Sequence, residues 1–370
     1  MKLICSKSNL LYGVNIVSKA VPTRTTMAIL ECILIDASTN EIKLTANDME
    51  LGIETIIEGE ISERGVIALD AKIFSEIVRK LPDSDVVIET DASFKTTITC
   101  EKAKFNIIGK SGDDFSYLPY IERKECVSIS QFTLKEVIRQ TIFSIADNDN
   151  NKLMTGELFE INENKLKVVS LDGHRISIRN IELKDCYDHK KVVVPGKTLQ
   201  EVSKILPGSV DEEVNIYLAD NHIIFEFDKT TVVSRLIEGE YFRIEQMLSS
   251  AYETKVKINK RELLSCIDRA TLLVKEGDKK PIIMNVIDGS MELKINSFIG
   301  SMNEDIDILK EGKDILIGFN PKFFIDALRV IDEEEVTLYM VNPKAPCFIK
   351  DDEGKFIYLI LPVNFNAANN

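Results

Sequence analysis

The sequence predicts an α+β chain made of three similar domains in tandem. A short apolar strand that leads into a helix occurs three times, in residues 3–11, 127–135 and 256–264. A second helical motif begins with a lysine and recurs at equal intervals of 125 residues, at Lys72, Lys197 and Lys322. The apolar residues that end these helices keep the same interval, at Leu81, Leu206 and Ile331. Solenoid repeats have periods of about 20–50 residues, whereas a domain typically has about 100–150, so the repeating unit is a domain.

The first domain is expected to span residues 1–125. Its opening strand leads into a helix over residues 7–19. Short segments rich in Val, Ile and Thr are typical of strands, and here they are Ala28–Asp36, Glu41–Ala46, Leu51–Glu60 and Gly65–Leu69. A second helix follows over residues 72–80, and Pro82 stops it because proline cannot continue a helix. The domain is completed by strands at Val86–Thr90, Thr96–Cys100 and Lys104–Gly109.

The second and third domains repeat this order and are expected to span residues 126–253 and 254–370. In the second domain, helices are predicted over residues 133–143 and 196–206. Its strands are predicted at Leu158–Asn162, Lys165–Ser170, Arg175–Glu182, Lys191–Pro195, Val214–Ala219, His222–Phe227 and Thr231–Leu236. In the third domain, helices are predicted over residues 259–275 and 320–330. Polar stretches near residues 125 and 254 mark the two boundaries.

Composition excludes several classes of protein. No stretch reaches the roughly 18 apolar residues of a membrane helix, and the N-terminus lacks the apolar core of a signal peptide, so we expect a cytoplasmic protein without a membrane partner. The seven cysteines are scattered without a CxxC pair and there are three histidines, which indicates free thiols and neither a disulfide framework nor a metal site. Neither GxxxxGK[ST] nor GxGxxG occurs, so we expect no nucleotide cofactor and no ATP hydrolysis.

The distribution of charge is uneven. The formal net charge is −14, which taken alone disfavours nucleic acid, since phosphate contacts require Lys and Arg. The six predicted helices, however, hold 15 basic and 6 acidic residues and are each positive, whereas the remainder of the chain is strongly acidic. Lysine is common on solvated helix faces, and this is the alternative explanation. It does not account for a positive balance in every one of the six segments.

Three short motifs, together with the pattern of three domains, resemble a known protein family. Residues 171–176 (LDGHRI), residues 236–241 (LIEGEY) and residues 358–363 (YLILPV) resemble conserved-looking segments of the bacterial DNA polymerase III β subunits, the sliding clamps. Arg24 lies in a Pro-Thr-Arg stretch before an apolar strand, as the N-terminal arginine of that family does. The resemblance extends over the whole chain in one register.

This resemblance implies a DNA polymerase processivity factor. In the family, two chains form a head-to-tail homodimeric ring with sheets outside and helices inside, and the ring encircles double-stranded DNA without reading its sequence. The implied partners are the replicative polymerase alpha subunit, the clamp-loader delta subunit and other replication or repair proteins that carry a clamp-binding linear motif. The implied location is the cytoplasm, at replication forks on the nucleoid. The chain is expected to be a non-catalytic accessory subunit of a nucleotidyltransferase, with a separate ATP-dependent loader opening the ring.

Basic residues on the helices and nearby loops are the candidates for DNA contact. They are Arg24, Lys72, Arg79, Lys80, Lys135, Arg139, Lys152, Lys197, Lys204, Lys260, Lys322 and Arg329. The alternative for any one of them is an ordinary solvated charge. The family has tyrosines in the loop that corresponds to residues 150–153, where this chain has Lys152 and Leu153.

A partner pocket is implied between the second and third domains. Its walls, carried over from the family by position, are Met154, Leu171, Gly173, His174, Arg175, Ile176, Phe242, Met247, Leu359, Leu361, Pro362 and Val363. Methionine-rich apolar walls suit several partners because methionine repacks easily. From periodicity alone these would be core residues. Phe242 stands where the family often has proline, and a polar tail, Asn364–Asn370, extends past the usual end and is expected to be disordered.

Ring closure is implied at two further places. The expected halves of the dimer contact are Phe105 and Ile107, on the last strand of the first domain, and Leu272 and Leu273, on the first helix of the third. Internal packing is the alternative.

Asp172 and His174 raise the possibility of an enzyme, but no nucleophile or orienting partner accompanies them, and Asp-Gly is common in turns. A clamp-fold paralogue that serves as a protein-interaction scaffold without replicative loading remains the other functional reading.

Overall fold

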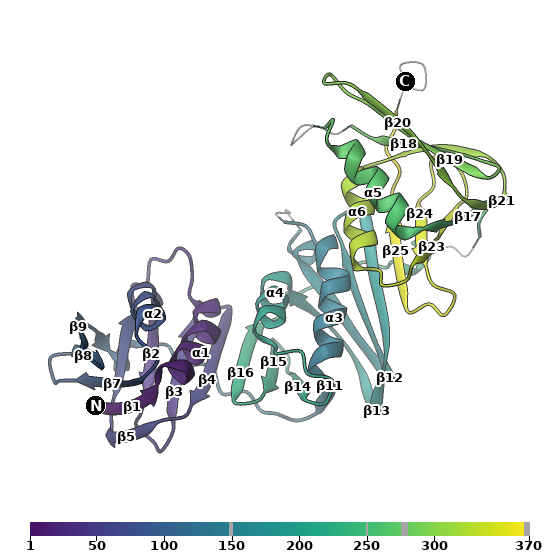
Figure 1. Ribbon diagram of the computed structural model, residues 1–370. Coiled ribbons are helices and arrows are strands. Elements are labelled where there is room, and N and C mark those ends of the chain that lie inside the picture. Colours follow the sequence, from purple (N-terminus) through teal and green to yellow (C-terminus); the bar gives the residue numbers. More distant parts are fainter. Residues whose placement is uncertain (148–150, 249–250, 275–279, 366–370) are drawn as a thin grey trace. The chain divides into compact units, whose positions relative to one another are not determined.

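The computed structural model describes residues 1–147, 151–248, 251–274 and 280–365. It contains two compact units, each described on its own: unit 1 comprises residues 1–134 and 197–236, and unit 2 comprises residues 135–196 and 237–370. In both units, runs of strands are interrupted by single α-helices (Figure 1). Within the described ranges, no helix combines the length and apolarity needed to span a membrane. Most of the predicted tail lies outside the described residues, as do Asn150 and Ser249 of the predicted loop and domain boundary.

Six α-helices agree in order and position with the six predicted ones. They are α1 (Lys7–Val17), α2 (Ala71–Lys80), α3 (Gln131–Thr141), α4 (Gly196–Ile205), α5 (Lys260–Thr271) and α6 (Pro321–Val330). Side-chain caps explain where several of them begin: Asp70 accepts a hydrogen bond from the amide of Ile73, and Asn320 caps α6, whose first residue is proline. Helix α5 ends four residues before its predicted end at residue 275, which itself lies outside the described ranges.

The repeated lysine motif has the same structure each time. Lys72, Lys197 and Lys322 are exposed at the start of α2, α4 and α6. Two residues later, Phe74, Leu199 and Phe324 are completely buried. Burying a side chain of this size contributes roughly 1.5–3 kcal/mol. The motif therefore anchors a helix on its sheet and leaves the lysine in solvent.

Unit 1 contains two antiparallel sheets. The first has the order β5-β1-β7-β8-β9, with strands β1 (Lys2–Ser6), β5 (Glu60–Glu63), β7 (Asp85–Thr90), β8 (Lys95–Cys100) and β9 (Ala103–Ile108). The second has the order β10-β6-β2-β3-β4-β16-β15-β14-β11, with strands β2 (Cys32–Asp36), β3 (Ile42–Asn47), β4 (Leu51–Ile57), β6 (Val66–Asp70), β10 (Lys110–Ser111), β11 (Cys126–Ser130), β14 (Glu213–Leu218), β15 (His222–Phe227) and β16 (Thr230–Arg235). Helices α1 and α2 pack beside each other on this second sheet (Figure 1).

One sheet of unit 1 joins two predicted domains. Strand β4 of the first domain pairs with β16 of the second, from Leu51 opposite Ser234 to Thr55 opposite Thr230. The hydroxyls of Thr55 and Thr230 lie 2.8 Å apart and are buried, so they satisfy each other at the junction.

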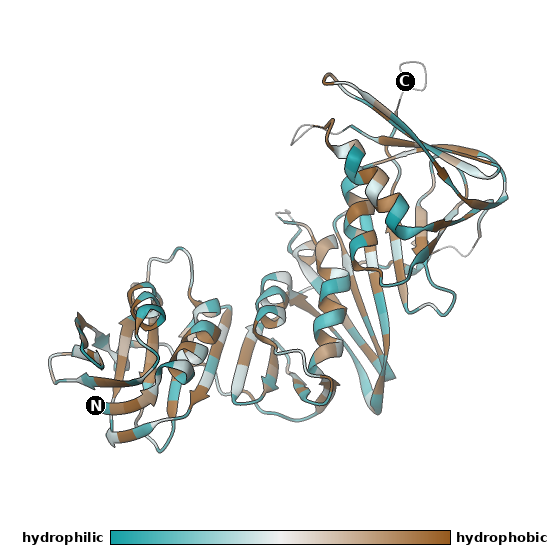
Figure 2. Cartoon of the chain, viewed as in Figure 1, coloured by the Kyte–Doolittle hydropathy of each residue, from teal (hydrophilic) through white to brown (hydrophobic). Residues whose placement is uncertain are grey.

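Unit 2 is organised in the same manner. Its larger sheet has the order β12-β13-β25-β24-β23-β17-β21, with strands β12 (Gly156–Leu171), β13 (Arg175–Pro195), β17 (Thr254–Asn259), β21 (Leu309–Gly312), β23 (Glu335–Met340), β24 (Cys347–Lys350) and β25 (Phe356–Ile360). Its smaller sheet has the order β20-β19-β18-β22, with strands β18 (Ile282–Ile287), β19 (Ser290–Asn296), β20 (Ser301–Asp307) and β22 (Ile315–Phe319). Helices α5 and α6 pack against each other, and Figure 2 shows hydrophobic and hydrophilic residues alternating along both.

The strand predictions were wrong in extent at three places in the chain. The predicted strand Ala28–Asp36 begins only at Cys32, because turn hydrogen bonds such as Leu30 N to Met27 O hold the preceding residues. The predicted strand Leu51–Glu60 ends at Ile57, and the chain then enters the other sheet as β5. The four strands predicted between residues 158 and 195 are two long strands, β12 and β13, whose pairing continues through irregularities on either side of Glu163.

Candidate functional sites

The predicted pocket residues lie together in unit 2. Leu171, Ile176 and Leu359 are buried in one hydrophobic cluster, and Met154 and Phe242 pack against it from partly buried positions. Met247 and Leu361 keep 55% and 37% of their surface exposed, and Pro362 and Val363 are half-buried; these four described residues are not part of the cluster. A buried apolar floor with a partly exposed apolar rim is the arrangement that a small hydrophobic motif requires.

Strand pairing positions these walls. Ile176 of β13 lies opposite Leu359 of β25, and the amide of Leu361 donates to the carbonyl of His174 at 2.9 Å. Between β12 and β13 the chain reverses at Gly173, whose φ of +82° is readily adopted by glycine. Asp172 closes this turn, because its carboxylate accepts from the backbone amides of His174 and Arg175. Asp172 therefore has a structural role in this turn.

Arg175 lies beneath the pocket surface. Only 7% of the residue is exposed. Its guanidinium donates to Asp172 at 3.0 Å and to Asp326 of α6 at 2.6 Å, and it lies 4.6 Å from the ring centre of Phe323. The charged group of Arg175 thus joins β13 to α6, and the assignment of this residue to the pocket wall stays a prediction.

Phe323 was missed by the sequence reading. Its ring stacks on His174 at 6.2 Å and is half-buried, so it extends the exposed rim from β13 onto α6. The available signal was the third lysine motif, where an aromatic residue follows Lys322 while threonine follows Lys197. Phe242, which stands where the family often has proline, packs edge-on against Tyr241 at 5.5 Å. Phe242 is therefore held by the floor of the pocket.

Glu157 is a buried acid on β12 in the same unit. It is completely buried, and neither of its carboxylate oxygens has a hydrogen-bond donor in suitable geometry within the described part of the chain. Loss of solvation raises the pKa of this carboxyl well above its usual range. The Thr141 hydroxyl opposes this rise, but weakly, because its proton is donated to the carbonyl of Val137 at 2.7 Å.

The predicted DNA-contacting residues fall into two groups. The residues of the first group already interact within the chain. Four of them form ion pairs: Arg139 with Glu136 and Asp332, Lys204 with Glu201, Arg329 with Asp268, and Lys197 with Asp48. The ammonium of Lys260 donates to the Ile331 carbonyl, and Lys135 also has an interaction.

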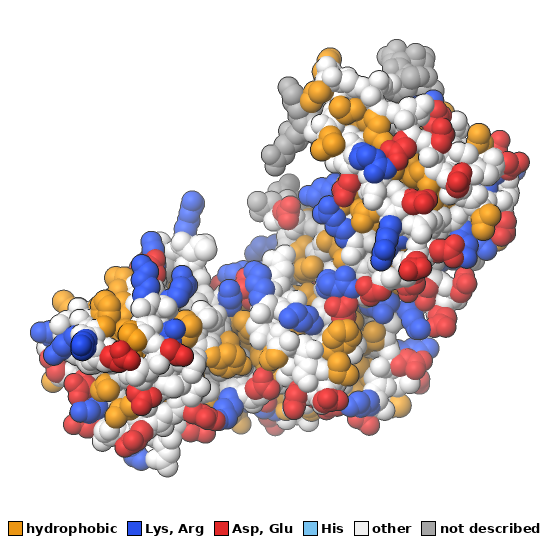
Figure 3. All heavy atoms as spheres, viewed as in Figure 1, with side chains coloured by type: hydrophobic (Ala, Val, Ile, Leu, Met, Phe, Trp, Pro, Cys, Tyr) orange, Lys and Arg blue, Asp and Glu red, His pale blue; other side chains and the backbone are white. Residues whose placement is uncertain are grey.

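The second group is exposed, and within the described residues its members have no ion-pair partner: Arg24, Lys72, Arg79, Lys80, Lys152 and Lys322. Arg24 and Lys152 lie outside the α-helices, in a loop and in the short 3-10 helix over residues 152–155. On the face of unit 1 that Figure 3 shows, Lys and Arg side chains gather over α2. The available positive charge is thus smaller than the sequence count suggested.

Of the two predicted halves of the dimer contact, one lies on a strand at a sheet edge and the other follows the end of helix α5. Strand β9 is the last strand of its sheet, with Phe105 at 37% exposure and Ile107 half-buried. In unit 2, β20 ends the smaller sheet. Leu272 follows the last residue of α5 and is 78% exposed, whereas Leu273 packs on the core of the third domain. Of the two leucines, only Leu272 presents most of its surface to solvent.

Comparison with known proteins agrees with this architecture. Three family models of the DNA polymerase III beta subunit match consecutive ranges: the N-terminal domain at residues 1–119, the central domain at 128–242 and the C-terminal domain at 245–364. The chain is 35% identical over 356 residues to the beta sliding clamp of Staphylococcus aureus, which covers 93% of this chain and 94% of that protein. The chain belongs to the DNA polymerase III beta subunit family.

Solved structures of this family have the same fold. A putative DNA polymerase III beta subunit from Eubacterium rectale matches with a TM-score of 0.96 and 85% identity over 99% of this chain and all of that one. The Bacillus subtilis sliding clamp matches with a TM-score of 0.95 and 32% identity over the same shares. The predicted α+β fold of three tandem clamp domains is confirmed, and the predicted processivity function is confirmed at the level of the family, whose members are accessory subunits of the polymerase.

Proposed function

We propose that two copies of this chain close head to tail into a ring around duplex DNA and tether the replicative polymerase to its template. The observation behind this proposal is that β9 ends a sheet in the first domain and β20 ends a sheet in the third, so that two of the sheet edges in the described residues lie in different domains of the chain. Because one copy offers each edge once, a second copy satisfies both edges and the assembly is closed.

The chemistry of these edges supports their pairing. Strand β9 carries Lys104 beside Phe105, and β20 carries Asp305 and Asp307, together with Glu304, which is already paired with Arg269. Opposite charges across an interface fix its register and favour the correct partner. Leu272 and Phe105 supply exposed apolar surface beside the two edges. The contact is thus expected to combine backbone hydrogen bonds, complementary charge and a small apolar core.

Weak contact with DNA follows from the proposed ring. The six exposed cations, Arg24, Lys72, Arg79, Lys80, Lys152 and Lys322, contact phosphates without reading bases, and the engaged cations contribute less. Retention then depends on topology and sliding is not impeded. The acidic remainder of the surface discourages binding outside the ring.

The pocket in unit 2 is proposed to hold the linear motif of the polymerase alpha subunit, the loader delta subunit and other partners. Leu171, Ile176 and Leu359 form its floor, and Met247, Leu361 and Phe323 its rim. We also propose that the chain has no catalytic activity of its own, because the Asp172 carboxylate accepts from the amide of His174 in the turn and the His174 ring stacks on Phe323. The proposed location, the cytoplasm at replication forks, is the one that the family implies.

Loading on DNA of different topology tests this function. Labelled chain is loaded on nicked circular plasmid with its clamp loader and ATP, separated by gel filtration, and compared with a sample linearised after loading. Co-elution with the circle and loss on linearisation are expected. Retention after linearisation contradicts the weak-contact mechanism. Failure to remain on either form, with a loader shown to be active on another clamp, favours the alternative of a clamp-fold interaction scaffold.

A further inference from the structure

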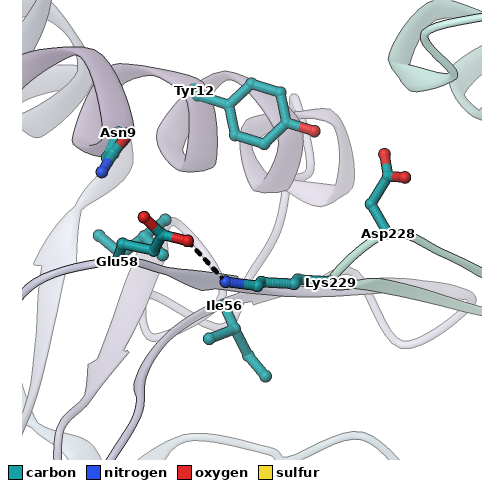
Figure 4. A pocket seen from close by; sticks show the side chains of 7 residues that line it. Asn9, Tyr12, Ile56, Glu58, Asp228 and Lys229 are labelled. Carbon is teal, nitrogen blue, oxygen red and sulfur yellow. Dashed lines mark hydrogen bonds and ion pairs between the residues drawn. The ribbon is translucent and has the colours of Figure 1, made fainter.

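Unit 1 has a cavity of about 340 Å³ that none of the sites above uses (Figure 4). Helix α1 contributes Asn9 and Tyr12, the end of β4 contributes Ile56 and Ile57, and Glu58 follows them. The two-residue turn between β15 and β16 completes the wall with Asp228 and Lys229. Small-ligand sites have volumes of about 300–1,000 Å³, so this cavity holds one side chain or a molecule of that size.

The cavity has an apolar part and an aromatic wall. Ile57 is buried below it and Ile56 is half-buried. Tyr12 is 48% exposed, and its ring borders the cavity on the side opposite Lys229 (Figure 4). An exposed aromatic face attracts cations through its quadrupole. These walls suit an extended aliphatic chain that ends in a flat cation.

Among the described charged side chains that line the cavity, one carboxylate is not neutralised by an ion pair and is available to a ligand. Lys229 and Glu58 form an ion pair of 2.9 Å across the cavity floor, so each compensates the other. Asp228 lies beside them, and within the described residues its hydrogen bond is to the side-chain amide of Gln131, at a long 3.4 Å. Burial, and secondly the charge of Asp228, raises the pKa of Tyr12, consistent with a carboxylate near the phenol. The site therefore has a net negative charge beside an aromatic face.

We propose that this cavity binds the arginine side chain of a linear segment of a partner protein. A guanidinium can stack on the Tyr12 ring and donate two hydrogen bonds to Asp228, while its aliphatic stem covers Ile56 and Ile57. Lysine lacks the planar group for stacking, and the net negative charge repels phosphate. The site is separate from the predicted motif pocket and does not depend on ring closure.

A titration with two matched probes tests the assignment. The full chain carries ¹³C-labelled isoleucine methyls, so that Ile56 and Ile57 report on the cavity by NMR. The probes are Nα-acetyl-arginine methylamide and its uncharged isostere, Nα-acetyl-citrulline methylamide. They are compared on the natural chain, on Asp228→Asn and on Tyr12→Leu, with Asp83→Asn as a charge-matched control at an exposed site elsewhere in unit 1.

The arginine probe is expected to give saturable shifts at Ile56 and Ile57, whereas citrulline binds about three- to five-fold more weakly. Asp228→Asn and Tyr12→Leu each weaken the arginine probe by a similar factor, and Asp83→Asn leaves it unchanged. Equal affinity for both probes, an equal loss in Asp83→Asn, or absence of saturable shifts overturns the proposal. A short peptide with arginine between two leucines must bind at least as tightly as the probe; weaker binding overturns the assignment to a protein segment.

Discussion

Replacing Glu157 should make the chain more stable, and the gain should increase with pH. The carboxyl is completely buried without a suitable donor, and its pKa is raised. In the unfolded chain the group ionises near its ordinary pKa of 4.5, whereas in the folded chain it stays protonated to higher pH. The unfolded state therefore releases a proton first as pH rises, and stability falls between the two pKa values.

The stability gained by replacing Glu157 has two parts. A buried polar group without a partner costs about 1–3 kcal/mol, and this part is present at every pH. Each unit by which the folded pKa exceeds the unfolded pKa adds about 1.4 kcal/mol at pH above both. Glu157→Met, which fills a similar volume without polar atoms, is therefore expected to gain about 1–3 kcal/mol at low pH and more at high pH. Glu157→Gln removes only the ionisation, so its advantage should appear mainly at high pH.

Thermal unfolding by calorimetry from pH 4 to 8.5 measures both parts, because the series begins below the ordinary pKa of 4.5. The natural chain, Glu157→Met and Glu157→Gln are compared with Glu182→Gln, an exposed glutamate on the neighbouring strand. The control should differ from the natural chain by no more than about 0.5 kcal/mol, with little change over the range. Parallel pH profiles for the natural chain and Glu157→Gln would refute the reasoning, because they would mean that burial does not shift the ionisation of Glu157.

Three further outcomes are expected. Leu272→Asp should convert the dimer to a folded monomer in analytical ultracentrifugation, and an unchanged dimer mass would remove Leu272 from the interface; Leu273 is a poorer choice because it packs on the core. Arg175→Met should destabilise the chain by about 3–5 kcal/mol, since it leaves two carboxylates without their cation, and Asp326→Asn should cost less; equal melting temperatures would contradict this. Lys72→Ala should shorten the residence of the loaded ring on linear DNA more than Lys204→Ala, because Lys204 is already paired with Glu201; equal effects would show that intramolecular pairing does not reduce DNA contact.

Local signals explain which parts of the fold the sequence predicted well. Helix starts were predictable because caps and prolines act within a few residues, as at Asp70 and Pro321. The long strands β12 and β13 were divided into four because polar residues around Glu163 resemble a chain reversal. Glu163 has a φ of +54°, and the pairing of β12 with β13 is irregular there but continues beyond it. Whether an interruption in a strand pattern is a turn or a bulge depends on the partner strand, which the local sequence does not specify.

In the candidate pocket, too, some features can be read from the local sequence and others depend on distant contacts. Its apolar residues were carried over from the family by position, and two of them, Ile176 and Leu359, lie opposite each other on β13 and β25. The engagement of Arg175 could not be predicted, since its partner Asp326 is 151 residues away and no local pattern links them. The same holds for the ion pairs of Lys197 with Asp48 and of Arg329 with Asp268, whose partners are far away in the sequence. The pairs Arg139–Glu136 and Lys204–Glu201 differ, because their members are three residues apart on one helix. Net charge can be read from composition, but the free charge at a surface depends on tertiary contacts.

Because β4 pairs with β16, the compact units of the structure do not coincide with the domain repeats of the sequence. Duplication of one domain accounts for the interval of 125 residues, yet the strands of the second copy are divided between the two compact units. A fragment limited to residues 126–253 would lose the partners of both β16 and β13 and leave two long edges open to association. Native-state hydrogen exchange should therefore group the amides of β16 with those of β4, and the amides of β13 with those of β25, across the limits of the repeats.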